Sequence, residues 1–303
     1  MNPCDMLRIQ IPASTANLGP GFDSIGMALG LYLTIDATRS DQWIVQTRNV
    51  ELQQLPNNEE NYIVQVAKEA AAYFGCMMPP CKLDIASEIP LARGLGSSSS
   101  AIIAAIELVN AFCQLELSQE EKFRFATLKE GHPDNAGATI YGGMAIGIQC
   151  DEHTELISLP LTDVFAIVTI PTFELKTEKA RAVLPETVDY RQAITSSAAA
   201  NVLVAAAASG DFGTVGKMME LDYFHEPFRT SLIPHLASIK AIAKAAGAYG
   251  TAISGAGPTV ITLAAEEYGY AIVDKIKEAF PEMIVRMVPI VNEGPIIKVY
   301  DSI

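Results

Sequence analysis

The sequence predicts an α+β protein with two domains. Segments with the alternating apolar pattern of strands and segments with helical spacing follow one another without a regular strand–helix–strand repeat, which argues against a doubly wound sheet. Half of the 303 residues are hydrophobic, so the chain can bury a large core. The composition shifts across residues 151–162, and we expect one domain in residues 1–155 and a second in residues 156–303.

The first half of the chain contains strands, turns and helices in a clear order. Residues 6–14 and 29–49 alternate apolar and polar side chains around a loop rich in turn formers, residues 15–26, which predicts a hairpin-like pair of strands with an elaborate loop. Residues 58–76 have helical spacing and stop at Gly75, and residues 82–91 form a strand pattern.

Two helices and a strand are expected next. The helix over residues 101–115 places Ile102, Ile106, Val109 and Cys113 on one stripe, so one face should be buried. Residues 118–131 form a second helix, which Ser118 and Glu121 should begin with a capping box. The glycine-containing segment 137–148 is expected to be a strand.

The second half mixes further helices and strands. The expected strands cover residues 164–171, 250–265, 284–290 and 294–300, and the expected helices cover residues 193–210, 211–222, 233–247 and 268–280.

Charge and composition exclude several classes of function. The net charge of −14 argues against a nucleic-acid surface and against an anionic membrane surface, which both need clustered lysines and arginines. Neither a signal-peptide pattern nor a membrane-length apolar run is present. The five cysteines, at positions 4, 76, 81, 113 and 150, form no CxxC pair, which fits a reducing compartment. We therefore expect a cytoplasmic protein.

The stretch RGLGSSSSAI, Arg93 to Ile102, follows a strand pattern and leads into a helix. Amide groups at a helix start have no intrahelical partner and the helix dipole is positive there, so this turn can bind a phosphate without lysine. Serine hydroxyls in the first turn can also coordinate magnesium. A lone cluster of this kind is more often a tight turn with serine caps, and it is not a Walker A sequence.

Two other turns and one short element change that balance. Asn17 and Asp23 lie in the loop that Gly19, Pro20 and Gly21 shape, and AISGAGPTV forms another glycine turn far along the chain. Four stretches resemble the motifs of the GHMP small-molecule kinase superfamily, and within it the homoserine kinase family. They are PASTANLGPGFDSIG, PLARGLGSSSSA, EGHPDNAGATIYGG and ISGAGPT. The motifs occur in the same order, and the resemblance runs from about residue 8 to the last strand.

The resemblance implies both a fold and a function. It implies a ribosomal protein S5 domain 2-like N-terminal domain that contains the ATP loop, a ferredoxin-like C-terminal domain, and a site in the cleft between them. The implied reaction is ATP-dependent phosphorylation of the side-chain hydroxyl of L-homoserine to O-phospho-L-homoserine, a step of threonine biosynthesis, with Mg²⁺ as cofactor. Relatives of this kind are often homodimers.

The resemblance also implies which residues bind ATP and the metal ion. The metal ligands would be Ser98 and Glu130, and carboxylates are natural ligands for magnesium. Many homoserine kinases have several more residues between this glutamate and the HPDN element, so a capping glutamate is the alternative for Glu130. The implied ATP-binding residues are Pro90, Leu91, Ala92, Arg93, Gly94, Leu95, Gly96, Ser97, Ser98, Ser99, Ser100, Gly255 and Gly257.

A site for an amino acid needs an acid, a cationic fork and a place for the hydroxyl. By resemblance, Asp23 meets the ammonium group, with Asn17 beside it as a neutral hydrogen-bonding partner. Arg181 and Arg229 resemble the two arginines of the family's substrate pocket, and a planar guanidinium suits a carboxylate.

Asn135 stands where mevalonate-type relatives have an aspartate base. An amide cannot take a proton at neutral pH, so catalysis would rest on placement and charge, which suffices for phosphoryl transfer through a loose transition state. We expect Asn135 to orient the acceptor hydroxyl. Asp134 is expected to be structural, and His132 is expected to fix its loop by hydrogen bonding.

Two other functions compete with this one. A mevalonate-type or sugar kinase would use an acceptor without an ammonium group, which would leave Asp23 and Asn17 without a partner. A sensor that kept the fold and lost turnover is the alternative from another class, although the motifs show no degradation.

Overall fold

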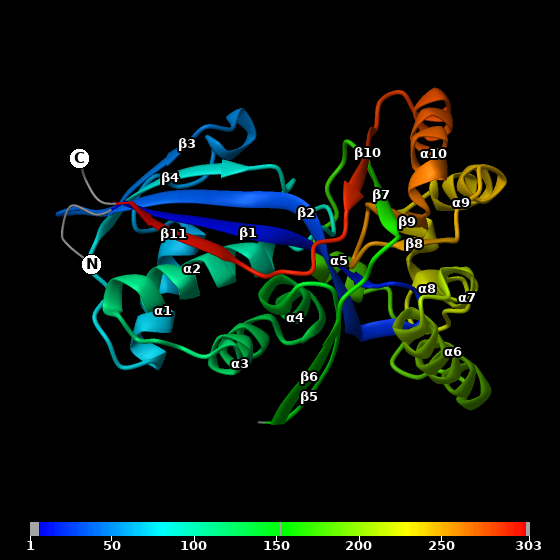
Figure 1. The fold of residues 1–303 in the computed structure, drawn as a ribbon, viewed down its shortest axis with the longest axis horizontal. Coiled ribbons are helices and arrows are strands. Elements are labelled where there is room, and N and C mark those ends of the chain that lie inside the picture. The colour runs from blue at the N-terminus through cyan, green and yellow to red at the C-terminus, as the bar shows by residue number, and fades with distance from the viewer. Residues whose placement is uncertain (1–5, 152, 301–303) are drawn as a thin grey trace.

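The computed structural model describes residues 6–151 and 153–300, which form two sheets with helices packed on them (Figure 1). The larger sheet has seven strands, and its order is β11-β1-β2-β4-β3, with β5 and β6 joined to the first part of β2. All pairs are antiparallel except β3 with β4. Its strands are β1 (Met6–Asn17), β2 (Gly21–Arg39), β3 (Ile44–Thr47), β4 (Cys81–Ser87), β5 (Met144–Cys150), β6 (His153–Leu159) and β11 (Ile296–Tyr300).

Helices cover one face of the larger sheet (Figure 1). Ile102, Ile106 and Val109 of α2 are buried, as the apolar stripe predicts, whereas Cys113 is only half-buried. The capping box of Ser118 and Glu121 begins α3. These helices are α1 (Tyr62–Tyr73), α2 (Ser97–Cys113), α3 (Gln119–Glu130) and α4 (Asp134–Tyr141), and a short 3₁₀ turn, η1 (Val50–Leu52), precedes them.

The smaller sheet has four antiparallel strands in the order β10-β7-β9-β8. The helices expected near residues 233–247 and 268–280 are present as α9 and α10, and both pack on this sheet. The strands are β7 (Phe165–Ile170), β8 (Gly250–Ile253), β9 (Val260–Ala264) and β10 (Ile284–Pro289). The helices are α5 (Thr177–Arg181), α6 (Tyr190–Ser209), α7 (Phe212–Met219), α8 (Glu226–Arg229), η2 (Thr230–Leu232), α9 (Leu236–Ala245) and α10 (Glu266–Ala279).

Three local predictions need correction. The segment 137–148 is not one strand, because α4 occupies its first part and β5 begins only at Met144. Gly137 lies within α4, and a Cβ there would lie 2.2 Å from the end of the Leu156 side chain, so the glycine allows close packing of α4 against β6. The segment 250–265 is two strands joined by the glycine turn, and the first hairpin has a loop of only residues 18–20.

The chain passes between the two sheets more than once. β6 pairs with β5 in the larger sheet and β7 belongs to the smaller one, so the first crossing lies in residues 160–164. The expected division at residue 155 therefore lies inside β6. After β10 the chain returns to the larger sheet as β11, and the turn of the first hairpin reaches toward α6 and α8 (Figure 1).

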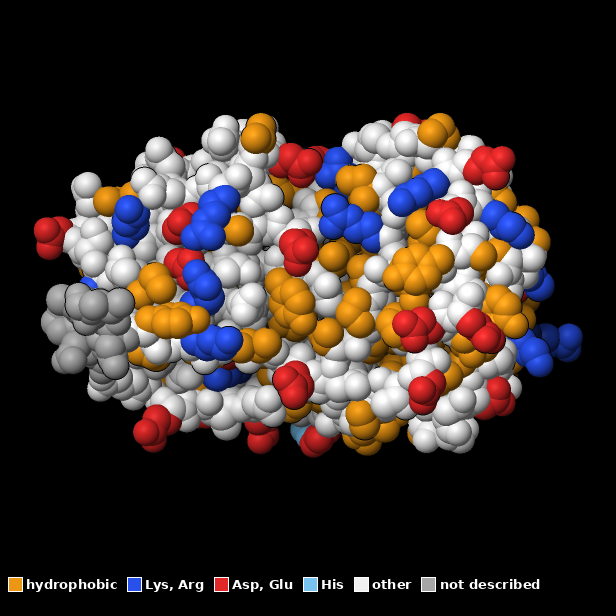
Figure 2. All heavy atoms as spheres, turned by 45° about the horizontal axis from the view of Figure 1, so that its top comes forward, with side chains coloured by type: hydrophobic (Ala, Val, Ile, Leu, Met, Phe, Trp, Pro, Cys, Tyr) orange, Lys and Arg blue, Asp and Glu red, His pale blue; other side chains and the backbone are white. Residues whose placement is uncertain are grey.

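Charges of both signs lie on the outer face of the larger sheet. Figure 2 shows blue and red side chains interspersed there, and the ion pairs of Asp36 with Arg8 and Arg48 belong to this face. Within the described residues, no helix is both long and apolar enough to cross a membrane.

Candidate active site

The three glycine turns singled out in the sequence meet at one place. Gly255 N donates to Ala16 O at 3.0 Å, and Asn17 Nδ2 donates to Gly255 O at 2.8 Å, so the first hairpin holds the turn after β8. Ser254 Oγ lies 2.6 Å from Gly94 O, which joins that turn to the loop before α2. A Cβ on Gly94 would lie 2.2 Å from Ser254 O, so this contact requires a glycine.

The start of α2 leaves amide groups open to a ligand. Gly96 is the N-cap in the left-handed conformation, with φ of 68°, and no side chain caps the helix. Ser100 N already bonds to Gly96 O at 2.9 Å, which leaves the N–H groups of Ser97, Ser98 and Ser99 at the exposed end of a 17-residue helix. This end can bind phosphate through its amides and its dipole.

Two cavities meet at this helix start. The larger, of about 990 Å³, lies between α2, β4 and the segment that leads into α1, and the smaller, of about 250 Å³, lies between α2, α4, α5 and the first hairpin. Ala92, Ser97, Ser98 and Thr177 line both. A ligand with an extended phosphate chain can therefore place a bulky apolar group in the larger cavity and its terminal phosphate in the smaller one.

Glu130 and the serines of α2 supply oxygen donors at the smaller cavity. Ser99 Oγ donates to Glu130 Oε2 at 2.6 Å, so the buried Ser99, and not the predicted Ser98, contacts the glutamate. Ser98 is exposed and lines both cavities. A carboxylate beside free hydroxyls at a phosphate-binding helix fits the hard oxygen ligands that Mg²⁺ prefers.

Asp23 and Arg181 form a two-point ion pair across the smaller cavity. Arg181 Nη1 donates to Asp23 Oδ2 at 2.9 Å and Nη2 donates to Oδ1 at 2.7 Å, and this pairing raises the pKa of Arg181 above its usual value. The residues predicted to meet an ammonium group and a carboxylate thus neutralise each other here. Both side chains are about one third exposed, at 33% and 38%, so a ligand can reach them.

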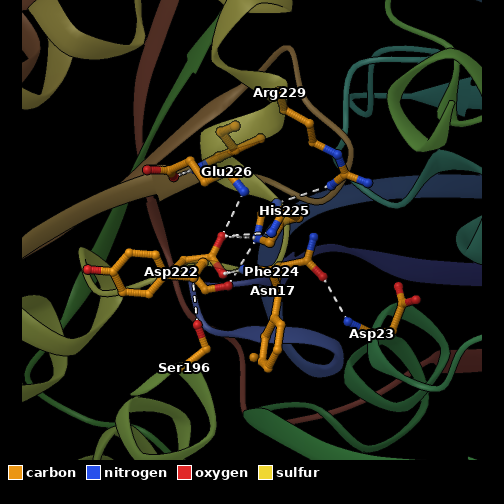
Figure 3. A network of polar contacts seen from close by, with 12 residues as sticks. Asn17, Asp23, Ser196, Asp222, Phe224, His225, Glu226 and Arg229 are labelled. Carbon is orange, nitrogen blue, oxygen red and sulfur yellow. Dashed lines mark hydrogen bonds and ion pairs between the residues drawn. The ribbon is translucent and has the colours of Figure 1, made fainter. Parts of the chain in front are cut away.

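Arg229 lies at the inner end of the same cavity and is only 1% exposed. Its guanidinium lies 5.4 Å from the centre of the Phe22 ring, and that of Arg181 lies 5.5 Å from it. Burial and the nearby Arg181 cation lower the pKa of Arg229 to about 10, so the group remains a cation at neutral pH. Arg229, Asn17 and Asp23 lie on the same side of His225 (Figure 3).

Asn135 lies in the first turn of α4 and points its amide into the cavity. Its Oδ1 accepts from Ser14 Oγ at 2.9 Å, and Ser14 Oγ in turn accepts from Thr139 Oγ1 at 3.2 Å. Nδ2 donates one hydrogen to Asp134 Oδ1 at 3.4 Å, and its second hydrogen can meet a ligand. Asp134 is 2% exposed and accepts from Asn135 N at 2.7 Å.

His132 fixes the HPDN turn by a hydrogen bond, as predicted, with 2.5 Å between Nδ1 and Asp134 Oδ1. Burial alone would lower the pKa of His132, but the contact with Asp134 raises it to about 9. The imidazolium therefore compensates one of the acidic groups around the cavity.

Several predicted ATP-binding residues lie elsewhere. The Arg93 guanidinium donates to Pro171 O at 3.0 Å and Thr172 O at 2.8 Å, so it joins the loop to the neighbouring segment and does not point at the helix start. Leu95 is fully buried in the core, and a Cβ on Gly257 would meet the Ile233 side chain. Pro90 and Gly257 line neither cavity, whereas Gly255 lines the smaller one.

The sequence patterns missed two groups of residues. The first is the lining of the larger cavity, which includes Thr47, Asn57, Asn61 and Tyr62, and no motif marked it. The second is the support of the predicted side chains by Ser14, which lies in the stretch PASTANLGPGFDSIG, and by His225, which lies four residues before Arg229. The signal that could have identified Ser14 and His225 is that each is a polar residue within a few positions of a residue marked by a motif.

Comparisons with known proteins indicate the family and the fold. The family model described as GHMP kinases N terminal domain matches residues 61–143, and the model described as GHMP kinases C terminal matches residues 203–282. A homoserine kinase of Bacillus licheniformis is 44% identical over 98% of each chain. The crystal structure of homoserine kinase from Cytophaga hutchinsonii has a TM-score of 0.86 at 26% identity over 98% of this chain and 99% of that one. The L. major mevalonate kinase shares the fold, with a TM-score of 0.74 at 17% identity over 94% and 96%.

Proposed function

The chain belongs to the GHMP kinases, and we propose that it transfers the terminal phosphoryl group of ATP to the side-chain hydroxyl of L-homoserine, giving O-phospho-L-homoserine for threonine biosynthesis. One observation supports this most directly. In the cavity of about 250 Å³ beside the open helix start, the Asp23 carboxylate lies with the guanidinium groups of Arg181 and Arg229 around the Phe22 ring. This set matches the charges of an amino acid.

The acceptor replaces the ion pair between Asp23 and Arg181 with its own contacts to both side chains. The ammonium group of homoserine replaces Arg181 at Asp23, and its carboxylate replaces Asp23 at Arg181 and meets Arg229. An acceptor with only a carboxylate, such as mevalonate, leaves Asp23 facing no cation once Arg181 has turned to the ligand, and an uncompensated charge in a partly buried site is costly. An uncharged sugar gains nothing from either arginine.

ATP lies with its phosphates at the start of α2. The nucleoside fits the larger cavity, and the triphosphate crosses Ser97 and Ser98 into the smaller one. Glu130 and Ser98 would hold Mg²⁺, with Ser99 fixing the glutamate through its 2.6 Å hydrogen bond. When bound, the ion neutralises charge on the phosphate oxygens.

Asn135 places the acceptor in line with the transferred group. Its Nδ2 donates to the acceptor oxygen or to a γ-phosphate oxygen, and Ser14 keeps the amide oriented from behind. The hydroxyl oxygen forms the new bond to phosphorus as the bond to the β–γ bridging oxygen breaks and ADP leaves. The hydroxyl proton passes late to the transferred phosphoryl group, so no side-chain base is required.

The cellular setting is part of the proposal. The described cysteines Cys76, Cys81, Cys113 and Cys150 are free thiols, which suits a reducing, cytoplasmic location, while Cys4 lies outside the described residues. The homodimer stays a prediction, and a measurement of the molecular mass in solution would test it.

A coupled assay of ADP release tests the function. We expect release with L-homoserine, and much weaker or no release with mevalonate, galactose or shikimate. Release with mevalonate or galactose in preference to homoserine contradicts the acceptor assignment. Nucleotide binding without ADP release from any acceptor supports the sensor instead.

A further inference from the structure

A fully buried histidine lies directly behind the substrate cavity. His225 is 0% exposed and begins α8, the short helix that ends at Arg229 (Figure 3). Its ring stacks on Phe22 with 5.2 Å between ring centres, and Phe22 lies next to Asp23 in the first hairpin. His225 therefore contacts the segment that carries Asp23 and the one that carries Arg229.

The turn that holds His225 is fixed by an acidic residue. The Asp222 carboxylate accepts from the backbone N–H groups of Phe224 at 2.7 Å, His225 at 3.2 Å and Glu226 at 2.7 Å (Figure 3). On the other side of α8, Glu226 pairs with Lys240 and accepts from Ile253 N at 3.0 Å. Asp222 Oδ2 also lies 3.4 Å from Nε2 of the ring, so one carboxylate contacts both the backbone and the ring of His225.

The two ring nitrogens of His225 have different partners. Nε2 lies 3.0 Å from Gly19 O, a carbonyl that can only accept, so Nε2 carries the proton. Nδ1 lies 3.2 Å from Arg229 Nη1, a group that can only donate, so Nδ1 is the acceptor. Both contacts require the same neutral tautomer, and they join the turn of the first hairpin to Arg229.

The remaining contacts of Arg229 determine which of its nitrogens can meet a ligand. Nε donates to Ala180 O at 3.1 Å, and Nη1 donates to Gly255 O at 3.1 Å as well as to His225. Both hydrogens of Nη1 are then used. Among the described residues, Nη2 has no hydrogen-bond partner, and the side chain lines the cavity. The guanidinium is turned so that Nη2 faces the space where the acceptor carboxylate would lie.

We propose that His225 is a positioning residue for the acceptor: its Nδ1 holds Nη1 of Arg229, which aims Nη2 into the cavity, while its Nε2–H holds the hairpin turn that carries Asp23. This inference rests on the proposed function, because the ligand of Nη2 is the carboxylate of the acceptor. It assigns the histidine no contact with the reacting atoms.

Two amide substitutions of His225 distinguish its contact with Arg229 from its contact with Gly19. In His225→Asn, the side-chain oxygen lies near the place of Nδ1 and can still accept from Arg229. In His225→Gln, the amide reaches the place of Nε2, so the contact with Gly19 is kept and the acceptor at Nδ1 is lost. Both variants lose the stacking on Phe22. We expect His225→Gln to raise the KM for homoserine about tenfold, since an unpaired buried donor is costly. We expect His225→Asn, which keeps an acceptor for Arg229, to raise this KM much less.

The matched control is His235→Gln, which alters another buried histidine whose Nε2 lies 3.4 Å from Pro258 O and which lines neither active-site cavity. It should lower the melting temperature without raising the KM for homoserine. In both His225 variants the KM for ATP should stay within about twofold of the native value, because the nucleotide phosphates do not contact α8. Equal homoserine KM values in native enzyme and His225→Gln, or equal losses in the Asn and Gln variants, would overturn the inference.

A measurement on the native enzyme covers the case in which the variants do not fold. In ¹⁵N spectra of histidine-labelled protein, which has four histidines, one ring should remain neutral with its proton on Nε2, and its Nδ1 signal should move when homoserine is added. Protonation of the His225 ring on Nδ1, or a His225 signal that homoserine leaves unchanged, contradicts the role. Absence of ADP release by the native enzyme with homoserine would instead refute the proposed function.

Discussion

The contact between the loop before α2 and the turn after β8 can be tested with two glycine substitutions of similar backbone geometry. Gly94 has φ of +75°, and a Cβ there would lie 2.2 Å from Ser254 O. Gly75 follows α1 with φ of +70°, and a Cβ there would meet nothing within 4 Å. Alanine therefore has a similar conformational cost at either position. Only in Gly94→Ala does the new Cβ also collide with a backbone atom, Ser254 O.

The difference between the two variants can be worked from these contacts. An L-residue in the left-handed region costs about 1–2 kcal/mol, which is the whole effect expected for Gly75→Ala. Gly94→Ala must also part the loop from the turn, which breaks the hydrogen bond between Ser254 Oγ and Gly94 O and adds about 1 kcal/mol. We expect a total near 2–3 kcal/mol for Gly94→Ala.

The same displacement should weaken nucleotide binding. Urea unfolding followed by circular dichroism gives the stability difference, and calorimetric titration with ADP gives the affinity. Gly75→Ala should bind ADP like the native protein, whereas Gly94→Ala should bind it about tenfold more weakly, equivalent to about 1.4 kcal/mol. Equal destabilisation with unchanged ADP affinity in both variants would refute the reasoning.

Three further predictions concern catalysis, the metal ion and stability. Asn135→Ala should lower kcat by about 100-fold with little change in folding, because it removes a donor that acts on the reacting groups; an inactive, folded Asp134→Ala beside a nearly normal Asn135→Ala would reverse the assignment. Ser98→Ala should raise the Mg²⁺ concentration needed for half-maximal rate more than Ser99→Ala does, and the opposite order would move the ligand to Ser99. Asp36 has a pKa below its usual 3.8, chiefly through its hydrogen bonds to Arg8, so the pairing stabilises the fold above that pH and the contribution is lost as the pH falls. Asp36→Asn should therefore lower the free energy of unfolding by about 1 kcal/mol at neutral pH, and urea titrations should show the difference from the native protein closing as the pH falls below the usual pKa of aspartate.

Much of the local structure was predictable from the sequence. The turns at Gly75 and Gly96 and the capping box at Ser118 depend on the backbone preferences of a few neighbouring residues, so they could be identified without tertiary information. The α+β class and the order of the elements followed from the same kind of local pattern. The resemblance of four ordered motifs then indicated the family.

Other features were decided only when distant segments packed together. Gly137 lies within α4 at a close contact with the end of the Leu156 side chain of β6, and local propensity cannot predict this contact. Asn135 meets Ser14 across 121 residues, and Arg181 meets Asp23 across 158. The same packing turned Arg93 away from the helix start and brought Ser99 to Glu130. Side-chain direction depends on which sheet and helix surfaces meet, so the sequence by itself determined the turns and the family, while only the tertiary structure determined which atoms face the acceptor.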